Sequence, residues 1–194
     1  MKKDKNKNLT KKEINERNHR RWVIGVTIGT FCSTLLVTWI SDALLANTTL
    51  LLSFLILAGI ILFGIVADVI GVAVTAVNID PFNAMAAKKI KGAKTAVRFV
   101  KNAAKVSNLC NDVIGDICGI VSGATSVSIA AQLLDAYPFI DAAILSLIMS
   151  ACVACLTVGG KALGKNFAMN NGTKIVHAFS VAAATIKGLF GFKE

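Results

Sequence analysis

The positively charged residues of this chain are confined to three blocks, and this distribution constrains the fold more than any other feature. Nine of the 21 lysines and arginines lie in residues 2–21, seven in 88–105 and five in 161–193. The intervening stretches, 22–87 and 106–160, carry no basic residue. Apolar stretches of this length are typical of membrane-spanning helices, and basic residues concentrate on the cytoplasmic side of a bilayer. The sequence therefore predicts an all-α integral membrane protein.

The apolar stretches divide into four expected membrane spans, which cover residues 22–45, 50–77, 106–131 and 139–160. The polar arm at the start is about twenty residues long, and the apolar run after it is longer than the core of a cleaved signal peptide. We therefore expect the first span to be retained in the mature protein.

These spans imply three regions and one orientation. Residues 1–21 form a basic cytoplasmic arm, 22–160 a transmembrane domain, and 161–194 a cytoplasmic tail whose apolar end can form an amphipathic helix. With the arm inside, the second and third basic blocks also lie inside, whereas both outer turns carry aspartate and no basic residue. We expect a multi-pass protein of the cell membrane with both termini in the cytoplasm.

Residues 81–105, between the second and third spans, have the pattern of an amphipathic helix. Apolar residues recur at intervals of three and four, and lysine or arginine occupies much of the remaining surface. An apolar stripe beside a basic face favours a helix that lies in the headgroup plane and binds anionic lipid. The alternative is an ordinary surface helix that packs on the rest of the protein.

Composition argues against two other classes of function. The net charge of +10 suggests nucleic acid, but the basic residues adjoin apolar spans instead of alternating with aromatic residues on a folded surface, so no nucleic-acid partner is expected. All five cysteines lie in apolar stretches, where cysteine acts as a small hydrophobic residue. His19 and His177 belong to no recognisable nucleophile arrangement. We therefore expect no enzyme activity.

Three carboxylates lie at or near membrane depth, and they are the strongest candidates for a functional site. Asp68 falls in the second span, and Asp112 and Asp116 fall one helical turn apart in the third, with Asn111 beside them. Ionisable residues within a membrane are costly and usually functional. Because these spans contain no lysine or arginine, a bound cation is the expected counter-charge. Oxygen ligands favour a hard ion such as Mg²⁺, although sodium or proton coupling uses the same residue types.

A purely structural role for the aspartates is the alternative. In that case Asp112 is solvated near the inner interface or pairs with Lys105 or Lys101, and Asp68 is protonated and hydrogen-bonded to a neighbouring helix. The third span also contains Gly115, Gly119 and Gly123 at intervals of four. Such a stripe of small residues predicts close helix packing, and it would let backbone carbonyls approach an ion held by the aspartates.

Several short motifs resemble the transmembrane domain of the CNNM/CorB–CorC family of magnesium transporters. Ala73 and Asn78 near the end of the second span match a helix-terminal pattern of that family, and Lys91-Gly92-Ala93 matches the end of its amphipathic helix. The segment 113–117 resembles a Gly-Asn motif, with Asp116 in place of the asparagine. The resemblance covers roughly residues 60–131 and implies a homodimer that binds Mg²⁺ near Asp116.

The chain also departs from that family. The glutamate common in the family's first span falls at Gly71, and the alignment needs a gap of about two residues before Gly115. The span over 22–45 is extra, and we expect this protein to lack the regulatory domains that usually follow the transmembrane domain in that family.

Three functions are consistent with these observations. The first is transport or binding of a divalent cation, Mg²⁺ in particular, through Asp116, Asp112, Asp68, Asn111 and Gly115. The second is a non-transporting membrane scaffold or regulatory subunit derived from such a domain. The third is a membrane-perturbing protein of the holin or toxin type, suggested by the small size and the basic arm.

Overall fold

The computed structural model describes residues 11–45 and 48–189, which form helices and short connections with no strand among them. The helices in chain order are α1 (Lys11–Leu45), α2 (Leu50–Ala76), α3 (Asp80–Ala87), α4 (Ala93–Lys101), α5 (Ala103–Asn108), the π-helix η1 (Leu109–Gly115), α6 (Asp116–Ala136) and α7 (Ala142–Leu189). This confirms the all-α prediction. Residues 11–21 of the expected arm continue into α1, and residues 1–10 lie outside the described part of the chain.

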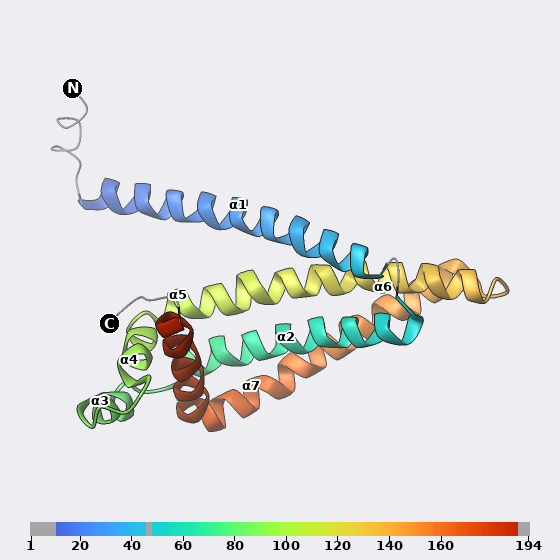
Figure 1. Ribbon diagram of the computed structural model, residues 1–194. Helices are drawn as coiled ribbons and strands as arrows, with labels where there is room; N and C mark the ends of the chain where they lie inside the picture. The colour runs from blue at the N-terminus through green and yellow to red at the C-terminus, as the bar shows by residue number, and fades with distance from the viewer. Residues whose placement is uncertain (1–10, 46–47, 190–194) are drawn as a thin grey trace.

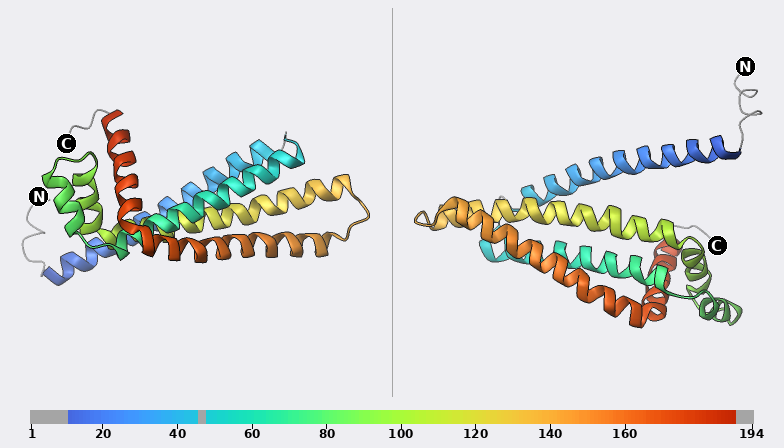
Figure 2. Two further views of the ribbon diagram at one scale, coloured as in Figure 1. Left: turned by 90° about the horizontal axis from the view of Figure 1, so that it is seen from below. Right: turned by 180° about the vertical axis from the view of Figure 1, so that it is seen from behind.

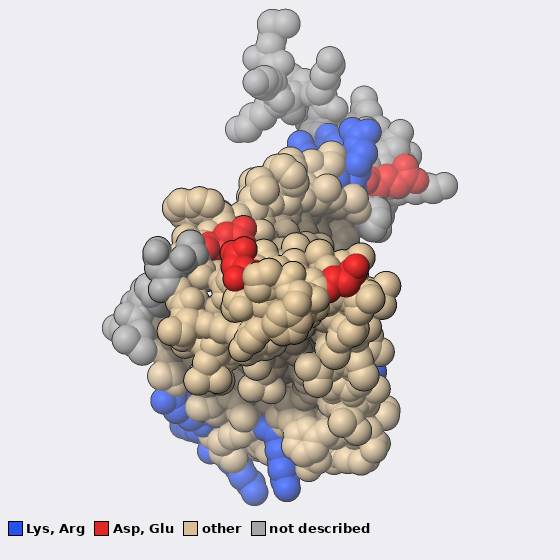
Figure 3. Space-filling view, turned by 90° about the vertical axis from the view of Figure 1, so that its right-hand side faces the viewer, with Lys and Arg blue, Asp and Glu red and all other residues tan. Residues whose placement is uncertain are grey.

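Within the described residues, four helices are long and apolar enough to cross a membrane. They cover Glu16–Ala43, Leu50–Ala76, Ala103–Ala136 and Ala142–Ile186. In Figure 1 the start of α1, the helices α3 and α4 and the last part of α7 lie toward one end of the molecule. The α1–α2 and α6–α7 connections lie toward the other end. Figure 3 looks onto that second end, where acidic side chains lie on the facing surface and basic side chains appear around its edges.

The last span differs from the prediction that it ends at residue 160. Helix α7 continues from Ala142 to Leu189 and has non-helical dihedral angles only at Asn171. The helix continues because small residues keep it packed against α2: Gly164 lies against Val69, and Gly172 against Val77. Residues 161–170 are therefore part of the helix that packs in the bundle, and the polypeptide turns away at the kink (Figure 2).

Close packing between long helices uses a different glycine stripe from the expected one. Around Gly119 and Gly123 of α6, no described atom outside the adjacent residues and the helix's own backbone lies within 4 Å of the position that a Cβ would take. The small residues of α7 at positions 160, 164, 168 and 172 recur at intervals of four and run along α2 instead. Small residues let helix backbones approach closely, so this stripe sets the spacing of α2 and α7.

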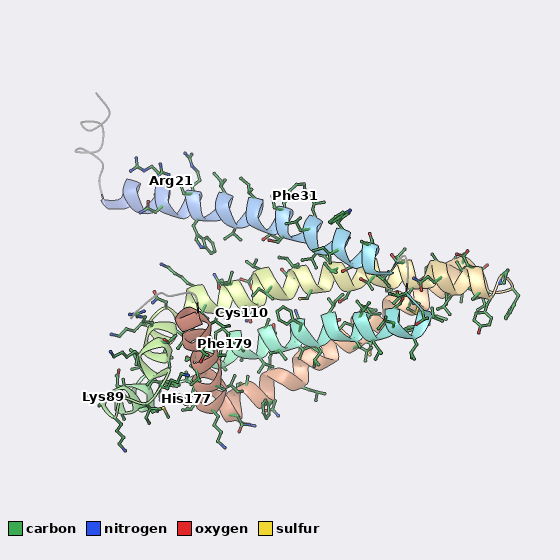
Figure 4. All side chains as sticks on the ribbon, viewed as in Figure 1. Arg21, Phe31, Lys89, Cys110, His177 and Phe179 are labelled. Atoms are coloured by element: carbon green, nitrogen blue, oxygen red, sulfur yellow. The ribbon has the colours of Figure 1, made fainter. Side chains whose placement is uncertain are left out.

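Helix α1 contacts the bundle mainly near its C-terminal end. Ser41 and Leu45 are buried, whereas apolar side chains earlier in the helix, including Phe31, are exposed. Figure 4 shows Phe31 and Arg21 pointing away from the other helices. The α1–α2 connection is fastened to α6 through Gln132, whose Nε2 donates to the carbonyl of Leu45 at 3.1 Å. An apolar exposed surface of this kind is what a lipid bilayer requires of a spanning helix.

The segment predicted as one helix over 81–105 is divided in the structure. Helix α3 ends at Ala87, and the chain turns through Lys89 and Gly92, whose φ angles are 56° and 81°, before α4 begins. Positive φ cannot continue a right-handed helix, so these two residues break the predicted one. Asn102 then separates α4 from α5.

The apolar faces of α3 and α4 are covered by the protein itself. Phe82 and Ala96 are fully buried in a cluster with Val74 of α2 and Val176 of α7. Phe99 of α4 also packs on Phe179 of α7, with ring centroids 5.3 Å apart. The basic residues of this region are exposed: Lys88, Lys89, Lys91, Lys94, Arg98, Lys101 and Lys105. The surface that this region exposes is therefore largely basic. That this surface lies at lipid headgroups stays a prediction.

Candidate functional site

The candidate site lies where α2 meets η1 and the start of α6. Gly64 of α2 lies against Cys118, since a Cβ on Gly64 would fall 2.8 Å from the Cβ of Cys118. Gly71 lies against the carboxamide of Asn111, and any side chain at position 71 would collide with it. Asp68 lies between these two glycines on the same face of α2, so it is directed toward η1 and α6.

Asp68 is buried without a hydrogen-bond partner for one of its oxygens. The residue is 5% exposed, and its Oδ2 accepts no hydrogen bond from any described residue. A buried carboxylate in this state is strongly disfavoured unless a proton or a positive charge compensates it. This orphaned oxygen is the feature of the structure that most strongly indicates a ligand.

Asn111 adds a second orphaned oxygen close by. Its Nδ2 donates to Ser107 Oγ at 3.3 Å, but its Oδ1 is buried and accepts no hydrogen bond within the described part of the chain. Asn111 belongs to η1, where the wider turns of a π-helix replace the α-helical pattern. Such π-helical segments are rare and occur frequently at functional sites. The site therefore combines a carboxylate and an amide carbonyl.

Asp112 and Asp116 do not face the contact between α2 and η1. Both are exposed, whereas Asn111 lies against Gly71 of α2 and Gly115 is buried beside Lys161 of α7. Of the five predicted site residues, Asp68 and Asn111 lie at the α2–η1 contact, with Gly115 next to it. Among the described residues, no three His, Cys, Asp or Glu side chains are grouped so that they could hold a metal ion.

The structure adds a residue that the sequence analysis assigned to the tail. Lys161 of α7 is partly buried, and its Nζ lies 3.3 Å from the position that a Cβ on Gly115 would take. Lys161 directly follows the expected fourth span, and it is a basic residue whose side chain reaches the contact between α7 and η1. The sequence gives no signal for this placement, because Gly159 and Gly160 before Lys161 are residues at which a helix commonly ends.

The chain matches no family model, no curated protein and no solved structure. The resemblance to magnesium transporters consequently rests on the short motifs of the sequence alone.

Proposed function

We propose that this protein binds a cation within its membrane domain and carries it across the bilayer, with Asp68 as the central ligand. The observation that carries the proposal is the buried Oδ2 of Asp68, which has no hydrogen-bond partner in the described chain. A cation satisfies such an oxygen and removes the cost of the buried charge.

Mg²⁺ is the ion that we propose, as the transported substrate. Asp68 Oδ2 and Asn111 Oδ1 are both oxygen donors, which suit a hard cation. Mg²⁺ usually keeps several waters and needs only one or two protein carboxylates, so a site with a single buried aspartate is compatible with it. Asp112 and Asp116, which are exposed on η1 and α6, are proposed to attract cations toward the site and not to hold them at its centre.

Transport requires that the site open alternately to the two sides, and we propose that movement of α7 against α2 provides this change. The small-residue contact between these helices lets them slide without large side chains interlocking. The homodimer and the descent from magnesium transporters are part of the proposal and come from the motif resemblance.

The test is the thermal stability of the detergent-purified chain in Mg²⁺, Mn²⁺, Ca²⁺ or Na⁺. We expect Mg²⁺ to raise the denaturation midpoint of the wild type and of Asp116→Asn, because a ligand that binds only the folded state stabilises it. Asp68→Asn keeps the shape of the side chain but removes its charge, so it should lose the Mg²⁺ response. A response retained in Asp68→Asn, or lost equally in Asp116→Asn, would contradict the assignment.

A non-transporting scaffold is the second candidate, and one observation favours it. The seven basic residues of α3, α4, α5 and their connections are all exposed, which leaves a continuous region suited to anionic headgroups. Figure 4 shows Lys89 at the far tip of this region. Reconstituted vesicles separate the two functions: a transporter gives Mg²⁺ flux that Asp68→Asn abolishes, and a scaffold gives none.

A further inference from the structure

Asp68 and Lys161 lie at a similar level along the bundle, as two independent helix registers indicate. Helices α2 and α7 run in the same direction, with Gly160 against Ile65 and Gly164 against Val69. Lys161 therefore leaves α7 at the level of residues 65–69 of α2.

The second register comes from the antiparallel contact of α2 with η1 and α6. Gly64 faces Cys118 and Gly71 faces Asn111, so this register sets Asp68 at the level of Ile114 and the adjacent Gly115. Gly115 is the residue at which the Nζ of Lys161 lies. The missing side chain of Gly115 leaves the room that the ammonium group takes.

An interaction between the Asp68 carboxylate and the Lys161 ammonium group is expected to be favourable at this level of the bundle. A carboxylate or an ammonium group alone is costly within a membrane protein, and a pair of opposite charges removes much of that cost. The charged residues nearest to Gly115 and Lys161 in the sequence are exposed: Asp112, Asp116 and Lys165. Cys118 is the other titratable side chain that faces this space, and it is neutral as a thiol.

We propose that Lys161 is the built-in counter-ion of Asp68, and that a cation must displace its ammonium group to bind. This inference rests on the proposed function for the displacing cation. The pairing itself does not depend on transport. The consequence is that Lys161 holds the ion-free protein together while it weakens cation binding, so that only an ion with sufficient affinity for Asp68 replaces it.

Two measurements on the full-length purified protein test the proposal. The first is a double-mutant cycle in the absence of divalent cations, with Asp68→Asn, Lys161→Gln and the double variant. We expect the two single substitutions to lower the denaturation midpoint by amounts that do not add, because each removes the same pair. Lys165→Gln, on the next turn of α7 and exposed, is the matched control and should show additivity with Asp68→Asn.

The second measurement is the Mg²⁺ concentration that gives half of the full stabilisation. Lys161→Gln should lower this concentration by about tenfold or more, since the competitor is gone, and Lys165→Gln should leave it unchanged. A merely structural lysine would not improve cation binding when removed.

The two measurements distinguish failure of the ion pair from failure of the proposed cation binding. Coupling in the cycle without any Mg²⁺ response in the wild type or Lys161→Gln would support the ion pair and overturn the proposed cation function. Additive single variants would overturn the proposal for Lys161 whatever the cation response. Coupling together with an unchanged half-saturation concentration would overturn the displacement step.

Discussion

The carboxamide of Asn111 lies directly against the backbone of Gly71, and this contact closes the α2–η1 interface beside Asp68. A larger side chain at position 71 would displace Asn111. Gly71 therefore lets η1 approach α2 closely, one helical turn after Asp68.

Gly71→Ala should destabilise the protein, because the new methyl group would overlap the Asn111 carboxamide. Overpacking of this kind costs about 1–3 kcal/mol, and the denaturation midpoint of the purified protein measures it. Gly123→Ala is the control, since nothing described lies within 4 Å of its Cβ position. Equal midpoints for the two variants would show that Asn111 does not hold this place.

Much of the fold follows from the sequence, because hydropathy and charge act over whole segments. The distribution of lysine and arginine predicted the four apolar helices, and the helices are present. The end of the last span could not be predicted in the same way. Lys161 is the first basic residue after the apolar run, and only its packing against another helix distinguishes a buried lysine from one that begins a tail.

The site was partly predictable for a related reason. Helical spacing places Asp112 and Asp116 on one face, and both are indeed exposed together. Spacing alone does not show which face of the helix meets α2. The wider turns of the π-helix η1 also change which residues share a face. Asp68 is isolated in its sequence, and its burial becomes visible only when three helices are assembled.

Gly92→Ala should disrupt the packing of α4 on α7. Gly92 has a φ of 81°, where an added Cβ costs about 1–2 kcal/mol, and that Cβ would also lie 2.9 Å from the Cα of Val181. Backbone atoms cannot move aside as a side chain can, so the denaturation midpoint should fall well below that of Gly59→Ala. Gly59 is exposed in α2 with no described atom within 4 Å of its Cβ position. A midpoint for Gly92→Ala equal to the control would contradict the left-handed turn.

Gln132→Leu should loosen the attachment of the α1–α2 connection to α6. The Gln132 amide donates to the carbonyl of Leu45 and accepts from Ser53 Oγ at 3.2 Å, and Ser53 is fully buried. Leu45 O and Ser53 Oγ each keep a hydrogen bond with Thr48, at 3.2 and 3.1 Å, so the substitution removes two part-buried bonds without leaving either group unpaired. Two such bonds are worth about 1–3 kcal/mol together. Ser128→Ala removes an exposed bond of 3.3 Å to Asp42 and a long bond of 3.5 Å to the carbonyl of Ala124, and it should change the stability by less than about 0.5 kcal/mol. Comparable losses in both variants would show that burial does not set the cost.

Orientation in the membrane can be tested at two exposed positions, one at each end of the bundle. Lys91 lies in the basic turn between α3 and α4, and Phe139 lies in the connection between α6 and α7 and is 84% exposed. Because basic residues are retained in the cytoplasm, we expect position 91 to face inward and position 139 outward. A single cysteine is introduced at each position after the five native cysteines are replaced.

A membrane-impermeant maleimide should then label Phe139→Cys in intact cells and label Lys91→Cys only after permeabilisation. Six other basic residues remain between positions 88 and 105 in Lys91→Cys, so the substitution preserves the charge bias that sets the orientation. The reverse pattern would invert the proposed topology and set the arm and tail outside. Labelling of both positions in intact cells would mean that the chain inserts in two orientations and that its charge distribution does not fix one.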